Sequence, residues 1–307
     1  MAPPYKQLPR YMREMGRLFR AERWPIVHSH VNALSVFPLR AAERTGVPVR
    51  IAHSHSTAGK GETAKNAAKS VLKRFSNVYP THRMACSRYA GEWLFGKGAE
   101  FEVVYNGICL SRFAFNAEAR AKARADLGLA GGQLAVGHVG RFMPQKNHRF
   151  LIEEFAELAR LRPDAVLLLV GSGEAEALAE SWVAERGVAD RVMFLGQRDD
   201  VDRLYQAFDA FVLPSLYEGL PLVSVEAQAA GLPCFLSERI TREVDVTGTV
   251  RFLPIEDASV WAEALAEVEP GERVGASRGD FGDYDINCAA ERLAARYLGL
   301  KKETYVG

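Results

Sequence analysis

The sequence predicts an α/β protein with two doubly wound domains, each built on a parallel sheet covered by helices. The chain has 307 residues, more than usually fold around a single hydrophobic core. Short apolar runs alternate with helical patterns along the chain, which is typical of βαβ units. One of these runs ends in glycine, A-V-L-L-L-V-G-S-G at 165–173, as strands do beside ligand sites.

The N-terminal domain, residues 1–110, is expected to begin with an amphipathic helix at 8–23, with arginines opposite its apolar face. The segments that follow are predicted as a strand at 24–30, a helix at 32–45, a strand at 48–53, a basic helix at 65–75, a strand at 81–87 and a helix at 89–95. Because strands and helices alternate, neighbouring strands are expected to run parallel.

A second alternation predicts a complete doubly wound domain at residues 111–283. Its strands are expected at 133–139, 165–173, 191–195, 210–214 and 233–237. Its helices are expected at 148–161, 175–186, 201–207 and 221–230. A last helix is predicted at 285–299.

The composition is that of an ordinary globular protein, with 48% hydrophobic and 25% charged residues. No apolar run approaches the ~20 residues of a membrane-spanning helix, and no signal peptide is visible. The four cysteines are widely spaced without a C-x-x-C pair, which predicts neither zinc fingers nor a disulfide framework. A cytoplasmic protein is expected.

Positive charge is concentrated near the N-terminus. The first 75 residues hold 14 Lys and Arg against four acids, whereas the whole chain has a net charge of +1. This asymmetry predicts either a peripheral contact with anionic lipid or a solvated basic face. Nucleic acid is not expected as a partner, because no recognised binding motif accompanies the basic residues.

Two carboxylates, Glu218 and Glu226, are the most informative residues. They bracket seven positions in E-G-L-P-L-V-S-V-E, directly after the buried-strand pattern A-F-V-L-P. Pro221 suits the start of a helix, whose first N–H groups lack partners within it and attract anions. A sugar nucleotide would offer phosphates to the N–H groups and hydroxyls to the acids.

Four segments in this order resemble retaining glycosyltransferases of family 4, which have the GT-B fold. They are R-I-A-H-S-H-S-T at 50–57, V-Y-N-G-I at 104–108, V-G-H-V-G-R-F-M-P-Q-K-N-H at 136–148 and the E-x7-E segment. The resemblance is strongest to the branch that makes bacterial exopolysaccharide and capsule. It implies two Rossmann-like domains facing a cleft, with residues 284–307 crossing back to the first. It also implies an incomplete N-terminal domain, because the family's opening strand and glycine-rich loop would precede Met1.

The resemblance places a nucleotide-sugar donor on the second domain. Arg141 and Lys146, after the strand end at Gly140, would hold the diphosphate and stabilise its developing charge. Glu226 would bind the ribose hydroxyls, and Glu218 would act on the transferred sugar. Backbone groups are expected from three further residues, Gly219, Leu220 and Pro221. No metal or other cofactor is expected, since the cations and the helix start supply the positive charge that a metal ion would otherwise provide.

Three further positions of the donor half and the linker are expected to matter. Gly171 and Gly173 end a strand and either approach the nucleotide or form a tight turn. Arg198 lies in a loop that would present backbone to the base. Asn106 lies at the expected linker between the domains, where closure would hinge.

The candidate active-site histidine is His55, with His53 as the alternative two residues earlier. Either would lie at the carboxyl end of a strand, where α/β sheets place ligands. The sequence H-S-H occurs at both 28–30 and 53–55, a spacing that also permits zinc. Neither a cysteine nor an acid is near, so a metal site is not predicted.

These residues predict a retaining enzyme that moves a hexosyl group, most simply from a UDP-sugar, to a polysaccharide or lipid-linked sugar acceptor. A glycoside hydrolase is disfavoured, because both acids come from one strand–helix unit and phosphate-binding cations accompany them. A GT-B nucleotide-sugar epimerase and a truncated, catalytically impaired nucleotide-binding protein stay open as alternatives.

Overall fold

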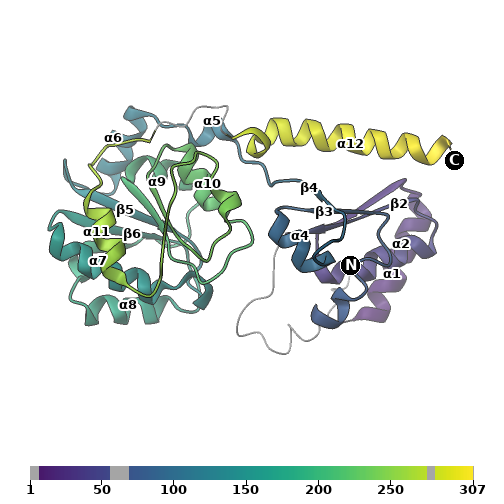
Figure 1. Ribbon diagram of the computed structural model, residues 1–307, viewed down its shortest axis with the longest axis horizontal. Coiled ribbons are helices and arrows are strands. Elements are labelled where there is room, and N and C mark those ends of the chain that lie inside the picture. Colours follow the sequence, from purple (N-terminus) through teal and green to yellow (C-terminus); the bar gives the residue numbers. More distant parts are fainter. Residues whose placement is uncertain (1–6, 56–68, 275–280, 307) are drawn as a thin grey trace. The chain divides into compact units, whose positions relative to one another are not determined.

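The chain forms two compact units in the computed structural model, which describes residues 7–55, 69–274 and 281–306 (Figure 1). The first unit consists of residues 1–107 and 286–307, and the second of residues 108–285. Both are α/β units with a parallel sheet, so the predicted fold class is confirmed. The basic helix predicted at 65–75 lies partly outside the described residues.

The first unit has a four-stranded parallel sheet in the order β1-β2-β3-β4. Its strands are β1 (Ile26–Ser29), β2 (Val49–Ser54), β3 (His82–Ala85) and β4 (Glu102–Val103). Its helices are α1 (Leu8–Glu22), α2 (Val36–Arg44), α4 (Arg88–Phe95) and α12 (Ile286–Val306). The helix predicted at 32–45 begins instead as a 3-10 turn over Asn32–Ser35, where Asn32 has a positive φ of 51°.

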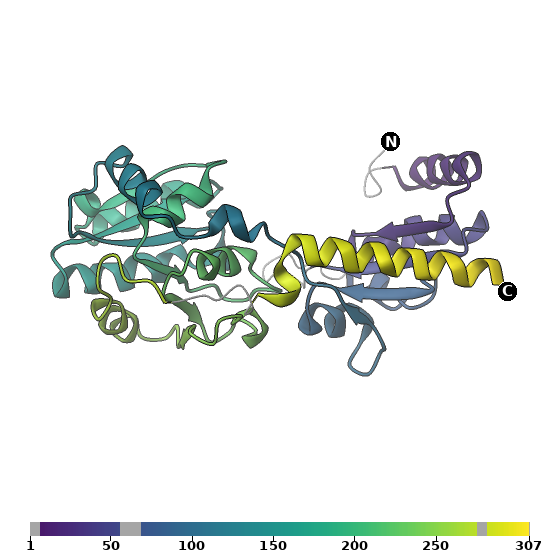
Figure 2. The same ribbon diagram turned by 90° about the horizontal axis from the view of Figure 1, so that it is seen from above.

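Alternation along β2 builds a core on each face of this sheet. Ala52 packs with Phe19 of α1 and Leu39 of α2 on one face. Ile51, its neighbour, packs with Leu300 of α12 on the other face. The C-terminal helix therefore completes the core of the first unit, and Figure 2 shows it running along this sheet.

The second unit has a six-stranded parallel sheet in the order β10-β9-β8-β5-β6-β7. Its strands are β5 (Leu134–Val139), β6 (Ala165–Val170), β7 (Val192–Phe194), β8 (Ala210–Leu213), β9 (Cys234–Ser237) and β10 (Arg251–Leu253). Its helices are α5 (Leu110–Phe113), α6 (Ala117–Asp126), α7 (His148–Leu161), α8 (Glu176–Glu185), α9 (Val201–Ala207), α10 (Leu222–Ala229) and α11 (Ala258–Ala266). The strand order reverses between β5 and β8, and this switch point is where doubly wound folds bind ligands.

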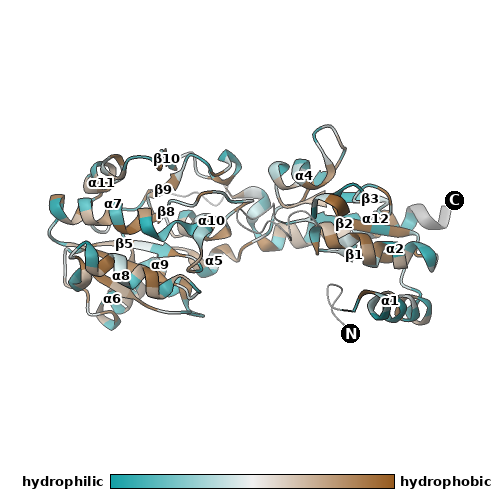
Figure 3. Ribbon diagram, turned by 90° about the horizontal axis from the view of Figure 1, so that it is seen from below, coloured by the Kyte–Doolittle hydropathy of each residue, from teal (hydrophilic) through white to brown (hydrophobic). Residues whose placement is uncertain are grey.

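Every residue of β5, β6, β8 and β9 is buried, as a parallel sheet covered on both faces requires. Figure 3 shows hydrophobic and hydrophilic stretches alternating along the helices that cover this sheet. The ring of Phe208 packs directly against the backbone of Gly137 in β5. A Cβ at this position would lie 2.1 Å from that ring, so a residue with a side chain would not fit. The fold thereby fixes the loops that follow β5 and β8 next to each other.

Candidate functional site

Two loops meet at the carboxyl ends of β5 and β8. The loop after β5 contains the 3-10 turn Pro144–Lys146, and the loop after β8 contains Glu218. The backbone N–H of Leu216 donates to the carbonyl of Gln145 at 2.8 Å, and Asn147 Nδ2 donates to the carbonyl of Pro214 at 3.2 Å. These bonds hold the two predicted donor loops side by side.

Glu218 and Lys146 form an ion pair within this junction. Lys146 Nζ lies 2.7 Å from Glu218 Oε1, although the residues are 72 positions apart in the chain. Gln145 Nε2 donates to the other carboxylate oxygen at 3.0 Å. Both charged side chains are largely buried, with 13% and 10% of their surfaces exposed. Glu218 is therefore part of a built site rather than an exposed loop acid.

Glu226 lies in the second turn of α10 and has a polar partner on α9. The Tyr205 hydroxyl lies 3.1 Å from Glu226 Oε2 and 2.8 Å from the carbonyl oxygen of Val223, and can donate to either. Burial raises the pKa of Glu226, and the Tyr205 bond and the Arg112 charge act in the opposite direction. Arg112 is anchored by its donation to Asp202 at 3.0 Å.

Arg141 and the start of α10 supply the remaining features expected of an anion site. Arg141 is exposed and makes no ion pair with another residue in the described part of the chain. No side chain caps the start of α10, where Pro221 precedes the first helical residue. The cation and the uncapped helix start are thus available to a ligand.

Gly171 and Gly173 serve the packing of two loops. Gly171 has a φ of 138°, and a Cβ there would lie 2.0 Å from the carbonyl oxygen of Gly140. A Cβ at Gly173 would lie 2.3 Å from the carbonyl oxygen of Phe142. The close approach that these glycines permit is therefore to the loop after β5.

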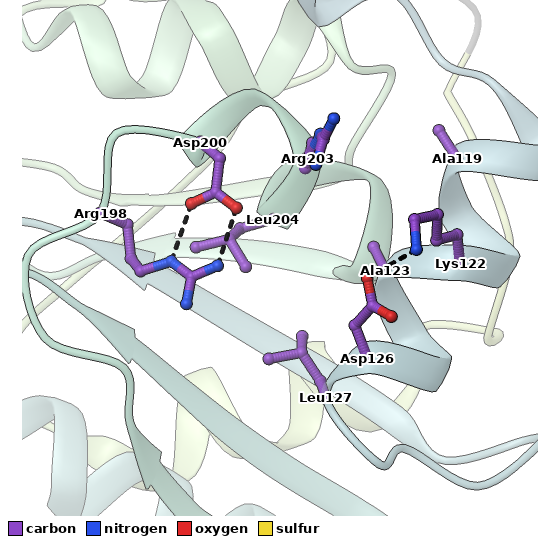
Figure 4. A pocket seen from close by; sticks show the side chains of 9 residues that line it. All are labelled: Ala119, Lys122, Ala123, Asp126, Leu127, Arg198, Asp200, Arg203 and Leu204. Atoms are coloured by element: carbon purple, nitrogen blue, oxygen red, sulfur yellow. Dashed lines mark hydrogen bonds and ion pairs between the residues drawn. The ribbon is translucent and has the colours of Figure 1, made fainter.

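Arg198 is not brought to the other predicted residues. It forms a two-point ion pair with Asp200, at 2.7 Å for each bond (Figure 4). Both residues line a pocket of about 230 Å³ against α6 that contains no other predicted site residue.

Histidines from two neighbouring strands of the first unit lie together. His30 Nδ1 lies 2.8 Å from His55 Nε2, and His28 Nε2 lies 3.1 Å from His53 Nδ1. Burial, followed by the neighbouring imidazoles, lowers the pKa of His28 to about 3 and that of His53 to about 2. These two rings are therefore neutral at pH 7.

The two candidate active-site histidines differ in accessibility. His53 is 3% exposed, whereas His55 is partly exposed at the end of β2. The backbone N–H of His55 donates to Asn32 Oδ1 at 2.7 Å. Burial lowers the pKa of His55, and a side-chain hydrogen bond with Asn106 opposes this. The structure thus brings Asn106 to His55.

The sequence analysis did not single out Gln145 and Tyr205, which bond to Glu218 and Glu226. It also did not single out Arg112, whose charge acts on Glu226, or Tyr297, which bonds to His28 beside the candidate histidines. Tyr205 and Tyr297 lie in helices whose contacts with the site depend on packing. Gln145 stands beside Lys146 within the recognised segment, so its position is the one signal that the sequence offered.

Comparison with known proteins gives two family matches. Residues 119–272 match the family described as glycosyl transferases group 1, and residues 2–107 match a glycosyl transferase 4-like domain. The putative glycosyltransferase EpsF of Bacillus subtilis (strain 168) is 40% identical over 255 residues, which is 80% of this chain and 66% of that protein.

A second relative is named UDP-Gal:alpha-D-GlcNAc-diphosphoundecaprenol alpha-1,3-galactosyltransferase, from Escherichia coli. It is 31% identical over 236 residues, which is 72% of this chain and 59% of that protein. The chain therefore spans about three fifths to two thirds of these relatives' length.

Solved structures support the fold. HepE of Anabaena in complex with UDP superposes with a TM-score of 0.80 at 18% identity, covering 97% of this chain and 84% of that one. Sucrose-phosphate synthase of Thermosynechococcus elongatus gives a TM-score of 0.77 at 22% identity, covering 98% and 80%.

Proposed function

This chain belongs to the group 1 glycosyltransferases, which are family 4 enzymes of the GT-B fold, and from this premise we propose that it transfers a hexosyl group from a UDP-sugar to a polysaccharide or lipid-linked sugar acceptor. Transfer would proceed with retention at the anomeric carbon. The observation that supports this most is the Lys146–Glu218 pair at the switch point of the second unit.

The charges suit a nucleoside diphosphate leaving group. An ammonium group has three donors, so Lys146 can keep its bond to Glu218 and still donate to a phosphate oxygen. Arg141 adds a planar guanidinium that can grip two oxygens. Together with the uncapped start of α10, they would stabilise the departing diphosphate without a metal ion.

The two acids would take different hydroxyl groups. Glu226, held by Tyr205, would accept hydrogen bonds from the ribose. Glu218 would accept from a hydroxyl of the transferred sugar, with Lys146 and Gln145 fixing its orientation. The backbone of Gly219, Leu220 and Pro221 would contact the sugar and the diphosphate.

The first unit would supply the acceptor side. His55 is the more exposed of the two candidate histidines, which favours it for contact with the donor sugar and the acceptor. Uracil as the base is supported by the UDP complex of HepE and by the UDP-Gal in the name of the Escherichia coli relative. The diphosphoundecaprenol in that name supports a lipid-linked acceptor.

A peripheral contact with anionic lipid is proposed for the arginine face of α1. Phe19 is buried and Met12 and Met15 pack against the core, so the apolar face of this helix is already used. Arg13, Arg17 and Arg20 line a hollow together with Arg44 of α2. None of the helices in the described parts of the chain has both the length and the apolar character that a membrane crossing needs. Sedimentation with anionic vesicles should therefore be lost at high salt and in Arg13→Glu/Arg17→Glu.

Calorimetric titration of the chain with UDP and GDP tests the donor site. We expect UDP to bind with the higher affinity, and Glu226→Gln to weaken it at least tenfold, or about 1.4 kcal/mol. Glu180→Gln, an exposed acid on α8, is the matched control. Equal UDP binding in Glu226→Gln and the control would contradict the proposal. A transferase should consume a UDP-sugar only when an acceptor is present, whereas an epimerase would convert it without one. A chain that binds UDP but turns over no UDP-sugar would be the catalytically impaired nucleotide-binding protein.

A further inference from the structure

His28, His30, His53 and His55 lie in or directly after β1 and β2 and form a cluster, and the proposed function assigns a role to His55 alone. From three of them, His28, His30 and His53, we infer a binding site for a divalent transition-metal ion that prefers nitrogen ligands, with Zn²⁺ as its type. One ring nitrogen of each residue lies within 4.8 Å of those of the other two. This inference goes beyond the proposed function, because nothing in it depends on a nucleotide sugar.

The parallel register of β1 and β2 creates the cluster. His28 pairs with Ile51 and Ser29 with Ala52, so one more step places His30 opposite His53. Residues two apart on a strand share a face, which puts each H-S-H pair on the same side of the sheet. The ring centroids of His30 and His53 are 5.0 Å apart as a result.

The hydrogen bonds of the two more buried rings direct one nitrogen of each toward the other. His28 Nδ1 lies 2.5 Å from the Tyr297 hydroxyl of α12, which leaves Nε2 to face His53 Nδ1 at 3.1 Å. His53 Nε2 is buried beside the backbone of Val104 without a hydrogen bond of normal geometry. Two ligands of a tetrahedral Zn²⁺ lie about 3.3 Å apart when each Zn–N bond is about 2.0–2.1 Å. The His28–His53 separation is therefore close to that of a metal-ligand pair.

The third ligand can complete the set because it is exposed. His30 is the outermost of the three rings, so its side chain can rotate to bring its nitrogen from within 4.8 Å of the other two to the shorter separation that a shared metal ion requires. Its exposure also leaves a path by which the ion can enter. Its bond to His55 Nε2 would be exchanged for the metal bond.

Tyr297 would act on the site from outside the ligand set. A metal-binding imidazole usually bonds its other nitrogen to a second group that fixes the ring. The Tyr297 hydroxyl occupies that position for His28. In the competing arrangement no metal ion binds, and the side chains form a chain of hydrogen bonds in which the Tyr297 hydroxyl donates to His28 and His28 donates to His53.

Titration of the metal-free chain with ZnCl₂ separates these arrangements. We expect one equivalent of Zn²⁺ to bind, and Co²⁺ in its place to give the visible absorption of a tetrahedral nitrogen site. His30→Ala should weaken binding by at least a hundredfold. His82→Ala, the same substitution at a histidine outside the cluster, should leave binding unchanged. Tyr297→Phe should weaken it about tenfold or more, as losses of such outer partners do.

Circular dichroism of each variant establishes that it is folded. Binding that persists in a folded His30→Ala chain would overturn the assignment, as would a folded parent chain that takes up neither ion. Zinc uptake by a chain that does not bind UDP would still support the site, so this inference and the proposed function fail separately.

Discussion

At the residue scale, the second unit keeps two opposite charges where water has little access. Lys146 and Glu218 have 13% and 10% of their side chains exposed, and each is the other's charged partner at 2.7 Å. Removing water from charged groups costs free energy that the pair recovers only while both members are present. A ligand phosphate would add a second anion for Lys146, whose ammonium group Glu218 already holds in place.

The pair can be tested by separating its effects on stability and on binding. Lys146→Met leaves Glu218 buried without its cation, and should lower the free energy of unfolding by about 3 kcal/mol. Adding Glu218→Gln removes the stranded charge and should restore most of that loss, whereas UDP affinity should stay low in both variants. Urea unfolding and calorimetry measure the two quantities. Additive losses in the double variant would show that the residues are not coupled.

Glu226 links the site to pH. Burial raises its pKa in the folded chain, so between the unfolded and the folded pKa the native state binds more protons than the unfolded state. Stability from this group is therefore full at low pH and declines as pH rises through that window. Glu226→Gln should be more stable than the parent at pH 7 and equal to it near pH 4, by urea unfolding. A variant that is less stable at pH 7 would show that the carboxylate stabilises the fold.

At the element scale, buried charges fix a helix that has no apolar stripe. Arg120 and Arg124 of α6 contact Asp209, which precedes β8, at 2.6 and 3.1 Å. Asp209 is fully buried and also accepts from the backbone N–H groups of Ala135 and Gly271, each at 2.8 Å. Electrostatic contacts thereby attach α6 to the sheet.

Asp209→Ala should be strongly destabilising, because two buried arginines lose their carboxylate partner and keep backbone carbonyl acceptors, while two backbone N–H groups lose the acceptor that Asp209 provides. We expect a loss of about 3–5 kcal/mol in the free energy of unfolding. Asp126→Ala on the same helix removes an exposed pair with Lys122 and should cost less than about 1 kcal/mol. Similar losses for the two variants in urea unfolding would contradict this account of α6.

The presence or absence of an apolar pattern explains which elements the sequence predicted and which it did not. The buried strands and α7 follow apolar patterns, so they were predicted within a few residues. The helix α6, A-E-A-R-A-K-A-R-A-D, lacks such a pattern because its partner is Asp209, and it was missed. Likewise the sequence placed Lys146 and Glu218 each in a loop after a buried strand, but their pairing depends on the strand order and on backbone contacts such as that of Leu216 with Gln145.

At the scale of the whole molecule, each unit has its own core, and the chain enters the first unit twice. Leu300 of α12 is fully buried with Val49, Ile51 and Met84, far from it in sequence. The residues proposed to bind UDP all lie within residues 108–285. Stability of the first unit and the nucleotide binding proposed for the second should therefore depend on different side chains.

Leu300→Ala tests this division. Removing the side chain from a filled core should destabilise the first unit by about 2–5 kcal/mol. Leu298→Ala, at a residue of the same helix that is 62% exposed, is the matched control and should have little effect. Hydrogen exchange followed by mass spectrometry reports each unit separately, and should show faster exchange in β1, β2 and β3 while calorimetry finds UDP affinity unchanged. Exchange that accelerates equally in β5 and β6, with a parallel loss of UDP affinity, would show that the two cores unfold together, and α12 would then stabilise the nucleotide-binding unit as well.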